Sequence, residues 1–217
     1  MKVDLHIHVD EGISTRDLYI HSKKLALDAV GCIAHNSLDL PLTYSKILSR
    51  KYELLAFPGV EITTDFGDVI LFNVEDKPKG NSLNEVLDFA RENKATLICS
   101  HPFFPPGLGK KAFRIENAAI ETLNGASRYF FWTNLVASIL AKRFNKASVW
   151  ASDAHIPSQI GLCWIKIPRS DQHEGLSTDL LKRVYDRGVS RSFGFPFDLL
   201  PMIRLELAGH KHALRTT

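Results

Sequence analysis

The chain has 217 residues, of which 45% are hydrophobic and 24% are charged. This length and balance suit one compact globular domain, or at most one domain with a small addition, and exclude a disordered chain. The formal net charge of +3 favours contact with anionic ligands but does not require nucleic acid.

Short apolar runs alternate along the chain with longer amphipathic segments. The runs predict strands over residues 2–8, 30–35, 54–60, 68–74, 96–101, 118–123, 148–152 and 162–167. Repeated β-α units imply a mainly parallel sheet, and roughly seven or eight strands in a chain of this length favour a small barrel over an open sheet. The functional residues of such barrels gather at the carboxyl ends of the strands.

The first predicted strand, "KVDLHIHV", alternates between apolar and polar residues. Its apolar face carries Val3, Leu5, Ile7 and Val9, and its polar face carries Asp4, His6 and His8. A polar edge strand that binds nothing has this pattern, and so has a strand that presents two histidines to a metal. The rest of the chain decides between these two interpretations.

Five further segments predict helices. The first covers residues 14–31, where Ser14 or Thr15 caps the start and Gly31 ends the helix in the left-handed conformation. In the segment 82–94, Ser82 is the N-cap and Glu85 follows three residues later, which is a capping box. The apolar segment 129–145 predicts a helix packed under a covering layer, and segments 177–188 and 196–212 predict two more helices.

Imidazole and carboxylate side chains fall repeatedly at the ends of the predicted strands. The chain has nine histidines, and five of them lie at these ends. Nitrogen and oxygen donors of this kind bind zinc, manganese or iron, and one ion takes roughly four to six of them. So many candidates predict two or three divalent ions close together. The strand-end candidates are His6, His8, His35, Glu61, Asp68, His101, Asp153 and His155.

The motifs "DLHIH", "HNS", "PGVEIT", "SHPF" and "SDAH", in this order, resemble the PHP (polymerase and histidinol phosphatase) family of metal-dependent phosphoesterases. The resemblance covers residues 4–155, and its motifs are specific in combination although each is weak alone. It implies an α/β fold, a distorted seven-stranded (β/α) barrel of the PHP type, with a trinuclear metal site. Residues 160–212 would complete the barrel, so that residues 1–217 form a single PHP domain.

The resemblance also implies which residues hold each metal. The first metal would be held by His6, His8, Glu61 and Asp153. The second would be held by Glu61, as a bridge, with His101 and Asp68. The third would be held by His35, His155 and an acidic residue of the "DEG" turn, which is Glu11 or, as the alternative, Asp10. Glu61, His101 and Asp153 would act in catalysis, in which a hydroxide held between metals attacks a phosphate ester.

The chain departs from the family pattern at three places. Ala34 stands where the family has an aspartate that would orient a neighbouring ligand. Asp68 stands where many members have histidine, and its harder oxygen donor would favour manganese over zinc. The "DEG" turn also follows His8 sooner than in many relatives. Outside these motifs, Asn124 could face the site or cap the turn before Gly125, and His173, His210 and His212 are expected to be solvated.

The loop after the fifth strand, "PFFPPGLGKKAFR", is the candidate for substrate binding. Lys110, Lys111 and Arg114 could receive phosphates while Phe103 or Phe104 stacks on a base, or the loop could be a solvated basic segment with an apolar anchor. The first interpretation favours nucleotides or short single-stranded oligonucleotides as substrates over a small ester such as histidinol phosphate. The oligomeric state is not indicated.

Two other classes of protein compete with a phosphoesterase. Amidohydrolases also place a His-x-His pair on a first barrel strand, but their late aspartate usually stands alone, whereas "SDAH" supplies Asp153 and His155 together. A non-catalytic RNA-binding relative, like the ribonuclease P subunit that resembles this family, would lack most of the metal ligands. A measurement of bound metal would separate this last alternative from both enzymes.

The cysteines and the apolar runs indicate the compartment. Cys32, Cys99 and Cys163 all lie in apolar stretches, as reduced core residues of a cytosolic protein do. The N-terminus does not resemble a signal peptide, and no apolar run is long enough to span a membrane. We therefore expect a cytoplasmic protein without a membrane contact.

Overall fold

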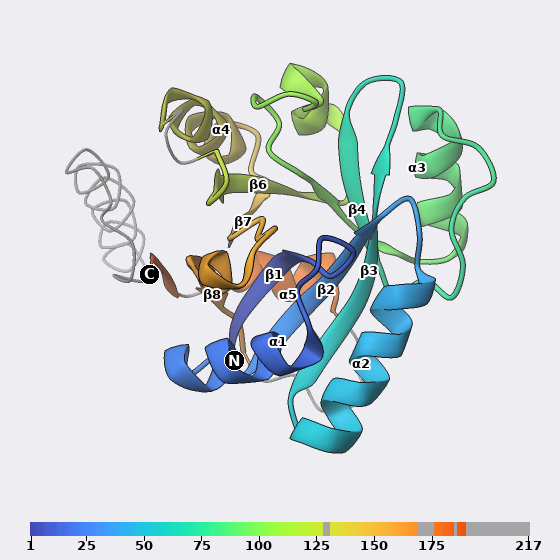
Figure 1. Cartoon of the computed structure of the whole chain (residues 1–217). Helices are drawn as coiled ribbons and strands as arrows, with labels where there is room; N and C mark the ends of the chain where they lie inside the picture. Colours follow the sequence, from blue (N-terminus) through green and yellow to red (C-terminus); the bar gives the residue numbers. More distant parts are fainter. Residues whose placement is uncertain (128–130, 169–175, 185, 190–217) are drawn as a thin grey trace.

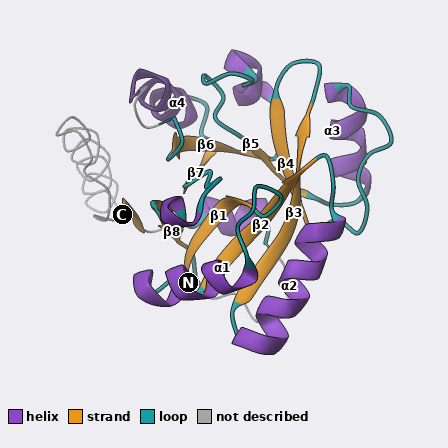
Figure 2. Ribbon diagram, viewed as in Figure 1, coloured by secondary structure: helices purple, strands orange, loops and turns teal. Residues whose placement is uncertain are grey.

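A computed structural model of the chain describes residues 1–127, 131–168, 176–184 and 186–189. In these residues, helices cover the outer side of a curved sheet (Figure 1, Figure 2). None of the helices within them has the length and apolar character needed to cross a membrane. The single domain over residues 1–217 stays a prediction, because the helix expected at 196–212, together with His173, His210 and His212, lies outside the described residues.

The sheet has nine strands in the order β7-β6-β5-β4-β3-β2-β1-β8-β9, so the expected count of seven is not confirmed. Strands β1 to β3 are parallel, as are β5 to β7, whereas β4, β8 and β9 run antiparallel to their neighbours. After β7, Ala154 forms a parallel bridge with Ile7 of β1, which nearly closes the sheet into a barrel. The strands are β1 Lys2–His8, β2 Ala29–His35, β3 Leu55–Thr63, β4 Asp68–Phe72, β5 Thr96–Cys99, β6 Ala118–Asn124, β7 Ala147–Ala151, β8 Cys163–Lys166 and β9 Asp186–Val189.

The helices begin with the caps that their sequences favour. Ser14 caps α1 in a capping box with Asp17, and the predicted box of Ser82 and Glu85 at the start of α3 is confirmed. Helix α2 packs on β2 and β3, and α4 packs on β6 and β7. The helices are α1 Thr15–Leu25, α2 Asp39–Tyr52, α3 Leu83–Glu92, α4 Phe131–Arg143 and α5 Thr178–Lys182, with 3₁₀ turns η1 Gly109–Arg114 and η2 Pro157–Gln159.

An irregularity in β1 divides its apolar residues between two cores. Val3 and Leu5 pack in a cluster that joins β1 to strands across the barrel, whereas Ile7 and Val9 pack with α1 and α2. The pairing of β1 with β2 shifts register between Asp4 and Ile7, as it does at a β-bulge. The predicted single apolar face of this strand is therefore wrong, because a bulge turns the following side chains to the other side.

Gly31 does not end the first helix, contrary to the prediction. Helix α1 stops at Leu25, and Ala26 adopts the left-handed conformation with φ of 51°. Gly31 lies inside β2, where a Cβ atom would sit 2.3 Å from the carbonyl oxygen of Leu5 on β1. The glycine is needed because the backbones of these two strands approach each other closely at this point.

Two predictions for the second half of the chain are also wrong. The expected helix 177–188 is the short helix α5 followed by strand β9, in which Gly188 makes room for the ring of Trp164 on β8. Within the described residues, no layer covers the outer side of α4, where Trp132 and Ile139 are exposed. Only one side of α4 meets the sheet, because the helix lies on the outside of the barrel.

Candidate metal centre

The predicted ligands lie together at one end of the barrel. Most of them follow the carboxyl ends of parallel strands, as expected for such folds. Asp68 is instead the first residue of β4, and it reaches the same end because β4 runs antiparallel to β3. We refer to these eight residues as the ligand cluster, and they are His6, His8, His35, Glu61, Asp68, His101, Asp153 and His155.

Glu61 lies at the centre of the ligand cluster. Its Oε1 is 3.6 Å from Nε2 of His6 and 3.5 Å from Nε2 of His101. Its Oε2 is 3.3 Å from Nε2 of His8. The Oδ1 atom of Asp153 is 3.3 Å from Nε2 of His6 and 3.2 Å from Nε2 of His8. The side chains expected at the first metal therefore converge, and Glu61 also reaches the His101 side.

Asp68 belongs to a second group of donors in the same cluster. One donor atom each of Glu61, Asp68 and His101 lies within 4.8 Å of the others, and all three residues are buried. His101 Nε2 is 4.0 Å from Asp68 Oδ2. This group contains the residues expected at the second metal.

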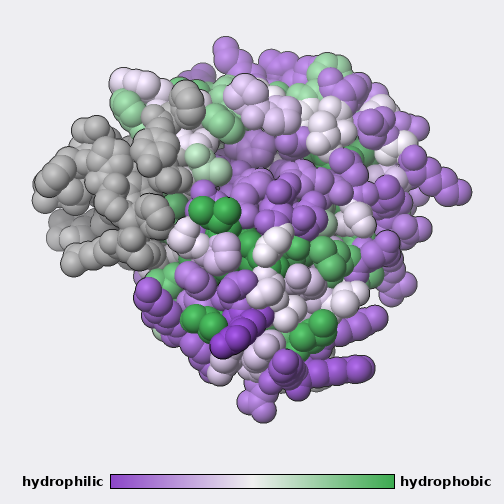
Figure 3. Space-filling model, in the orientation of Figure 1, coloured by the Kyte–Doolittle hydropathy of each residue, from purple (hydrophilic) through white to green (hydrophobic). Residues whose placement is uncertain are grey.

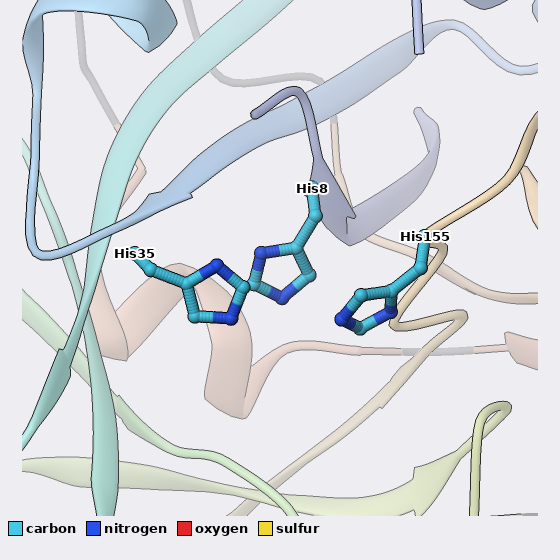
Figure 4. Close-up of side chains that lie close together, drawn as sticks. All are labelled: His8, His35 and His155. Carbon is cyan, nitrogen blue, oxygen red and sulfur yellow. The ribbon is translucent and has the colours of Figure 1, made fainter. Parts of the chain in front are cut away.

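Three imidazoles form a third group (Figure 4). The His8 ring lies between the other two, with its centroid 4.1 Å from that of His35 and 4.4 Å from that of His155. Asp10 accepts a hydrogen bond from the His35 backbone N–H at 2.9 Å, and the same oxygen is 2.9 Å from Nδ1 of this ring. Glu11 also offers an oxygen beside His35. Of the two acidic candidates, Asp10 makes the closer contacts with His35.

Buried atoms without hydrogen-bond partners show that the cluster fits divalent ions. Among the described residues, these atoms include Oε1 of Glu61, Oδ1 of Asp68 and Oδ1 of Asp153. A buried polar atom without a hydrogen-bond partner lowers the stability of the fold by roughly 1–3 kcal/mol, and by more when it is charged. Carboxylate oxygens beside imidazole nitrogens are donors for zinc, manganese or iron, and an ion would remove this cost.

The same contacts shift the pKa values of the cluster in the metal-free protein. Burial lowers the pKa of His8, but the nearby carboxylates of Asp10, Asp153 and Glu61 outweigh it and raise this pKa to about 10. Burial likewise lowers the pKa of His101, but the contact with Glu61 outweighs burial and raises this pKa to about 9. Burial raises the pKa of Glu61, but the neighbouring imidazoles hold it well below its usual range. Without metal, the Glu61 carboxylate is therefore ionised and the His8 and His101 imidazoles carry protons at neutral pH.

Glu121 on β6 contacts two residues of the ligand cluster from outside, and it was not predicted from the sequence. Its Oε1 is 3.0 Å from Nδ1 of His6, and its Oε2 accepts hydrogen bonds from the His101 backbone N–H and from Asn124 Nδ2, each at 2.8 Å. The Asn124 amide also donates to Asp153 Oδ2 at 3.0 Å, so Asn124 faces the site. A lone carboxylate in the apolar run "AAIETL" was the signal that could have identified Glu121.

Asp4 of β1 is hydrogen-bonded to the segment that follows β7. It is fully buried and accepts hydrogen bonds from the backbone N–H groups of Ser152, at 3.0 Å, and Gly161, at 2.8 Å. Burial raises the pKa of Asp4 to about 6 in spite of these bonds. Because Ser152 directly precedes Asp153, Asp4 fixes the backbone that presents this ligand.

Two ligands are held in uncommon backbone conformations. His101 has a φ of 26° and Asp153 a φ of 51°. Positive φ values are uncommon for residues other than glycine, and they cluster at functional sites where the surrounding structure enforces them. Here the hydrogen bond from His101 to Glu121 and the bonds to Asp4 supply that enforcement.

The predicted substrate-binding residues lie on η1, beyond His101. Lys110, Lys111 and Arg114 are all exposed there. Phe103 is partly buried, and its ring packs on Phe113 with centroids 5.8 Å apart. The Phe104 ring lies edge-on to His101 at 6.3 Å. On the face in Figure 3, hydrophilic residues cover the middle as well as most of the rim.

Comparisons with known proteins agree with this fold. A family model described as PHP-associated matches residues 131–184, which include Asp153 and His155. An uncharacterised protein of Methanocaldococcus jannaschii is 31% identical over 176 residues, which cover 76% of this chain and 70% of that protein.

Solved structures extend the comparison. PsfC from Pseudomonas syringae has a TM-score of 0.62 at 15% identity and covers 98% of both chains. A two-domain protein from Bacteroides vulgatus, described as containing a predicted PHP-like metal-dependent phosphoesterase, has a TM-score of 0.61 at 16% identity over 85% of this chain and 63% of that one. At such identities the likeness concerns the fold alone.

Proposed function

This chain belongs to the PHP (polymerase and histidinol phosphatase) family, and we propose that it is a metal-dependent phosphoesterase that hydrolyses phosphate mono- or diesters. The observation that carries the proposal is the ligand cluster, in which three buried carboxylate oxygens without hydrogen-bond partners lie beside imidazoles. These donors suit zinc, manganese or iron, and the proposal does not depend on which of them binds.

We assign the donors to two or three ions according to their grouping. His6, His8, Glu61 and Asp153 would hold the first ion, and Glu61, Asp68 and His101 the second. The third would be held by His35 and His155 with Asp10 or Glu11. Bound there, divalent ions would act as Lewis acids toward phosphate oxygens and make water more acidic.

The chain's own residues would orient the substrate and handle the proton. Asn124 fixes one oxygen of Asp153 at 3.0 Å, and the other oxygen is buried without a hydrogen-bond partner. This oxygen lies 3.3 Å from His6 Nε2 and 3.2 Å from His8 Nε2, where we place the first ion, so it would bind that ion and take part in proton transfer from there. Burial raises the pKa of Asp153, but the charges of the nearby imidazoles hold it well below its usual range, so this carboxylate is ionised at neutral pH.

Nucleotides or short oligonucleotides are the substrate class that we favour within this activity. Lys110, Lys111 and Arg114 are exposed on η1, a few residues beyond His101, where they could receive further phosphates. A small ester such as histidinol phosphate would not need them. We also propose a cytoplasmic location, which the three buried cysteine thiols support.

The test is a panel of substrates given to protein reconstituted with manganese, zinc or iron. It contains simple phosphomonoesters, histidinol phosphate, nucleoside monophosphates, short single strands and amides. We expect hydrolysis of phosphate esters, abolished by chelators, with nucleotides or short strands preferred. Turnover of amides alone would point to an amidohydrolase, and less than one bound ion per chain with no turnover would overturn the proposal in favour of a non-catalytic relative.

A matched pair of variants links the activity to the cluster. Glu61→Gln keeps the shape of the side chain but removes the charge that we place between two ions, and turnover should fall by orders of magnitude with the fold retained. Glu75→Gln makes the same chemical change at an exposed residue shortly after β4 and should leave turnover unchanged. Near-normal activity of Glu61→Gln would remove Glu61 from the centre. Exclusive turnover of histidinol phosphate would refute only the nucleotide preference.

A further inference from the structure

We propose that Phe66 and Lys111 form a wall of the site that holds a nucleotide, with the Phe66 ring stacked on the base and Lys111 paired with a phosphate. This inference rests on the proposed phosphoesterase function and names the part of the protein that would select nucleotides. Phe66 was not predicted from the sequence, because it comes from the turn between β3 and β4 and not from the basic loop.

Phe66 is an exposed aromatic residue beside the ligand cluster. Its exposed fraction is 49%, which is high for a phenylalanine in a compact fold. It lies two residues before Asp68, so their Cα atoms are at most about 7 Å apart. An aromatic ring at this place is within reach of a substrate whose phosphate lies in the cluster.

The turn that carries Phe66 is held firmly. The hydroxyl of Thr64 accepts hydrogen bonds from the backbone N–H groups of Phe66, at 3.2 Å, and Gly67, at 3.1 Å. Gly67 has a φ of 142°, and a Cβ atom on it would lie 2.5 Å from the backbone of Gly107. The turn is therefore packed against the loop that follows His101. A ring presented on such a turn loses little freedom when it stacks on a ligand.

Lys111 adds a cation to this ring. Its Nζ lies 2.7 Å from the centroid of the Phe66 ring, which is a cation–π contact between η1 and the β3–β4 turn. Lys110 and Arg114 are exposed on the same 3₁₀ turn. Within the described part of the chain, no ion pair neutralises any of these three cations. An aromatic ring beside unneutralised cations suits a ligand that has both a flat base and phosphates.

The other aromatic residues of this region fit the role less well. Phe103 is partly buried and packs on Phe113, so part of its ring is covered by the core. The Phe104 ring lies edge-on to the His101 ring, and the Phe104 carbonyl oxygen lies 3.3 Å from Nδ1 of His101. Phe66 therefore takes the stacking role that the sequence analysis gave to Phe103 or Phe104.

The test compares adenosine 5′-monophosphate with glycerol phosphate, which has no base. For Phe66→Leu, we expect KM for the nucleotide to rise about tenfold with kcat nearly unchanged, since stacking contributes to binding. Glycerol phosphate hydrolysis should not change, and Phe66→Tyr should behave like the wild type. Phe144→Leu is the matched control, because Phe144 follows α4 and is 45% exposed, and it has no place in the proposed wall. This variant should leave the hydrolysis of both substrates unaffected.

Calorimetry on the metal-reconstituted protein, with the non-hydrolysable phosphonate analogue of adenosine 5′-monophosphate, separates this inference from the proposed function. Binding of the analogue should weaken about tenfold in Phe66→Leu. Binding should also weaken in Lys111→Gln, and added salt should reduce the difference between this variant and the wild type. If glycerol phosphate is hydrolysed but Phe66→Leu changes neither nucleotide KM nor nucleotide binding, the wall is refuted and the phosphoesterase stands. If nucleotide binding depends on Phe66 but no ester is hydrolysed, the proposed function fails instead. Equal losses for both substrates would also refute the stacking role.

Discussion

Replacement of Glu121 by glutamine should weaken metal binding although Glu121 is not itself a proposed ligand. The carboxylate only accepts hydrogen bonds, so its contact with His6 at 3.0 Å requires a proton on Nδ1 of that ring. The Nε2 atom of His6 then faces Glu61 and Asp153, where we place the first ion. Glu121 thus acts as a positioning residue, through the ring of His6.

The expected size of the effect follows from the bonds that glutamine cannot keep. One oxygen of Glu121 accepts from two donors, His101 N–H and Asn124 Nδ2, so the amide oxygen of glutamine should turn toward them. Its NH₂ group would then face Nδ1 of His6 and favour a proton on Nε2, which cannot bind metal. Loss of such an outer partner typically costs 10–100-fold in metal affinity, which is about 1.4–2.7 kcal/mol.

The assay is competition between the metal-free protein and a chelating indicator for zinc or manganese. Glu116→Gln is the matched control, because it makes the same change at an exposed residue that precedes β6. Thermal unfolding of both variants checks that the fold persists, and ¹⁵N shifts of the His6 ring report its tautomer directly. An affinity within twofold of the wild type, or an equal loss in Glu116→Gln, would refute this reasoning.

Two further predictions follow from the pKa values. Metal uptake at pH 7 should release protons, because the pKa values of about 10 for His8 and about 9 for His101 keep both imidazoles protonated without metal. The affinity for metal should therefore fall as the pH is lowered. Calorimetry in two buffers of different ionisation enthalpy measures the number of protons released. No release should be seen if the two rings are neutral. Burial raises the pKa values of Cys32 and Cys99 to about 12. Neither thiol should therefore react with a disulfide reagent at pH 8 until the protein is unfolded. Rapid labelling of the native protein would contradict their burial.

The residues that depend on their neighbours along the chain could be identified from the sequence. The capping box of Ser82 and Glu85 is an example, because its hydrogen bonds join residues three positions apart. The strand-end histidines are another, since the carboxyl ends of parallel strands meet at one end of a barrel wherever the strands lie in the sheet. For this reason the ligand cluster could be assembled before any strand order was known.

Other features depend on contacts between distant parts of the chain, and only the tertiary structure decided them. The bulge in β1 arises from pairing with β2, and Gly31 lies in a strand because the backbone of Leu5 passes close to it. Glu121 became recognisable only when β6 brought it against His6, which is 115 residues away. Phe66 meets Lys111 only because the β3–β4 turn packs on the loop after His101. A local pattern carries no information on such pairs, because their contact is set by the packing of the whole barrel.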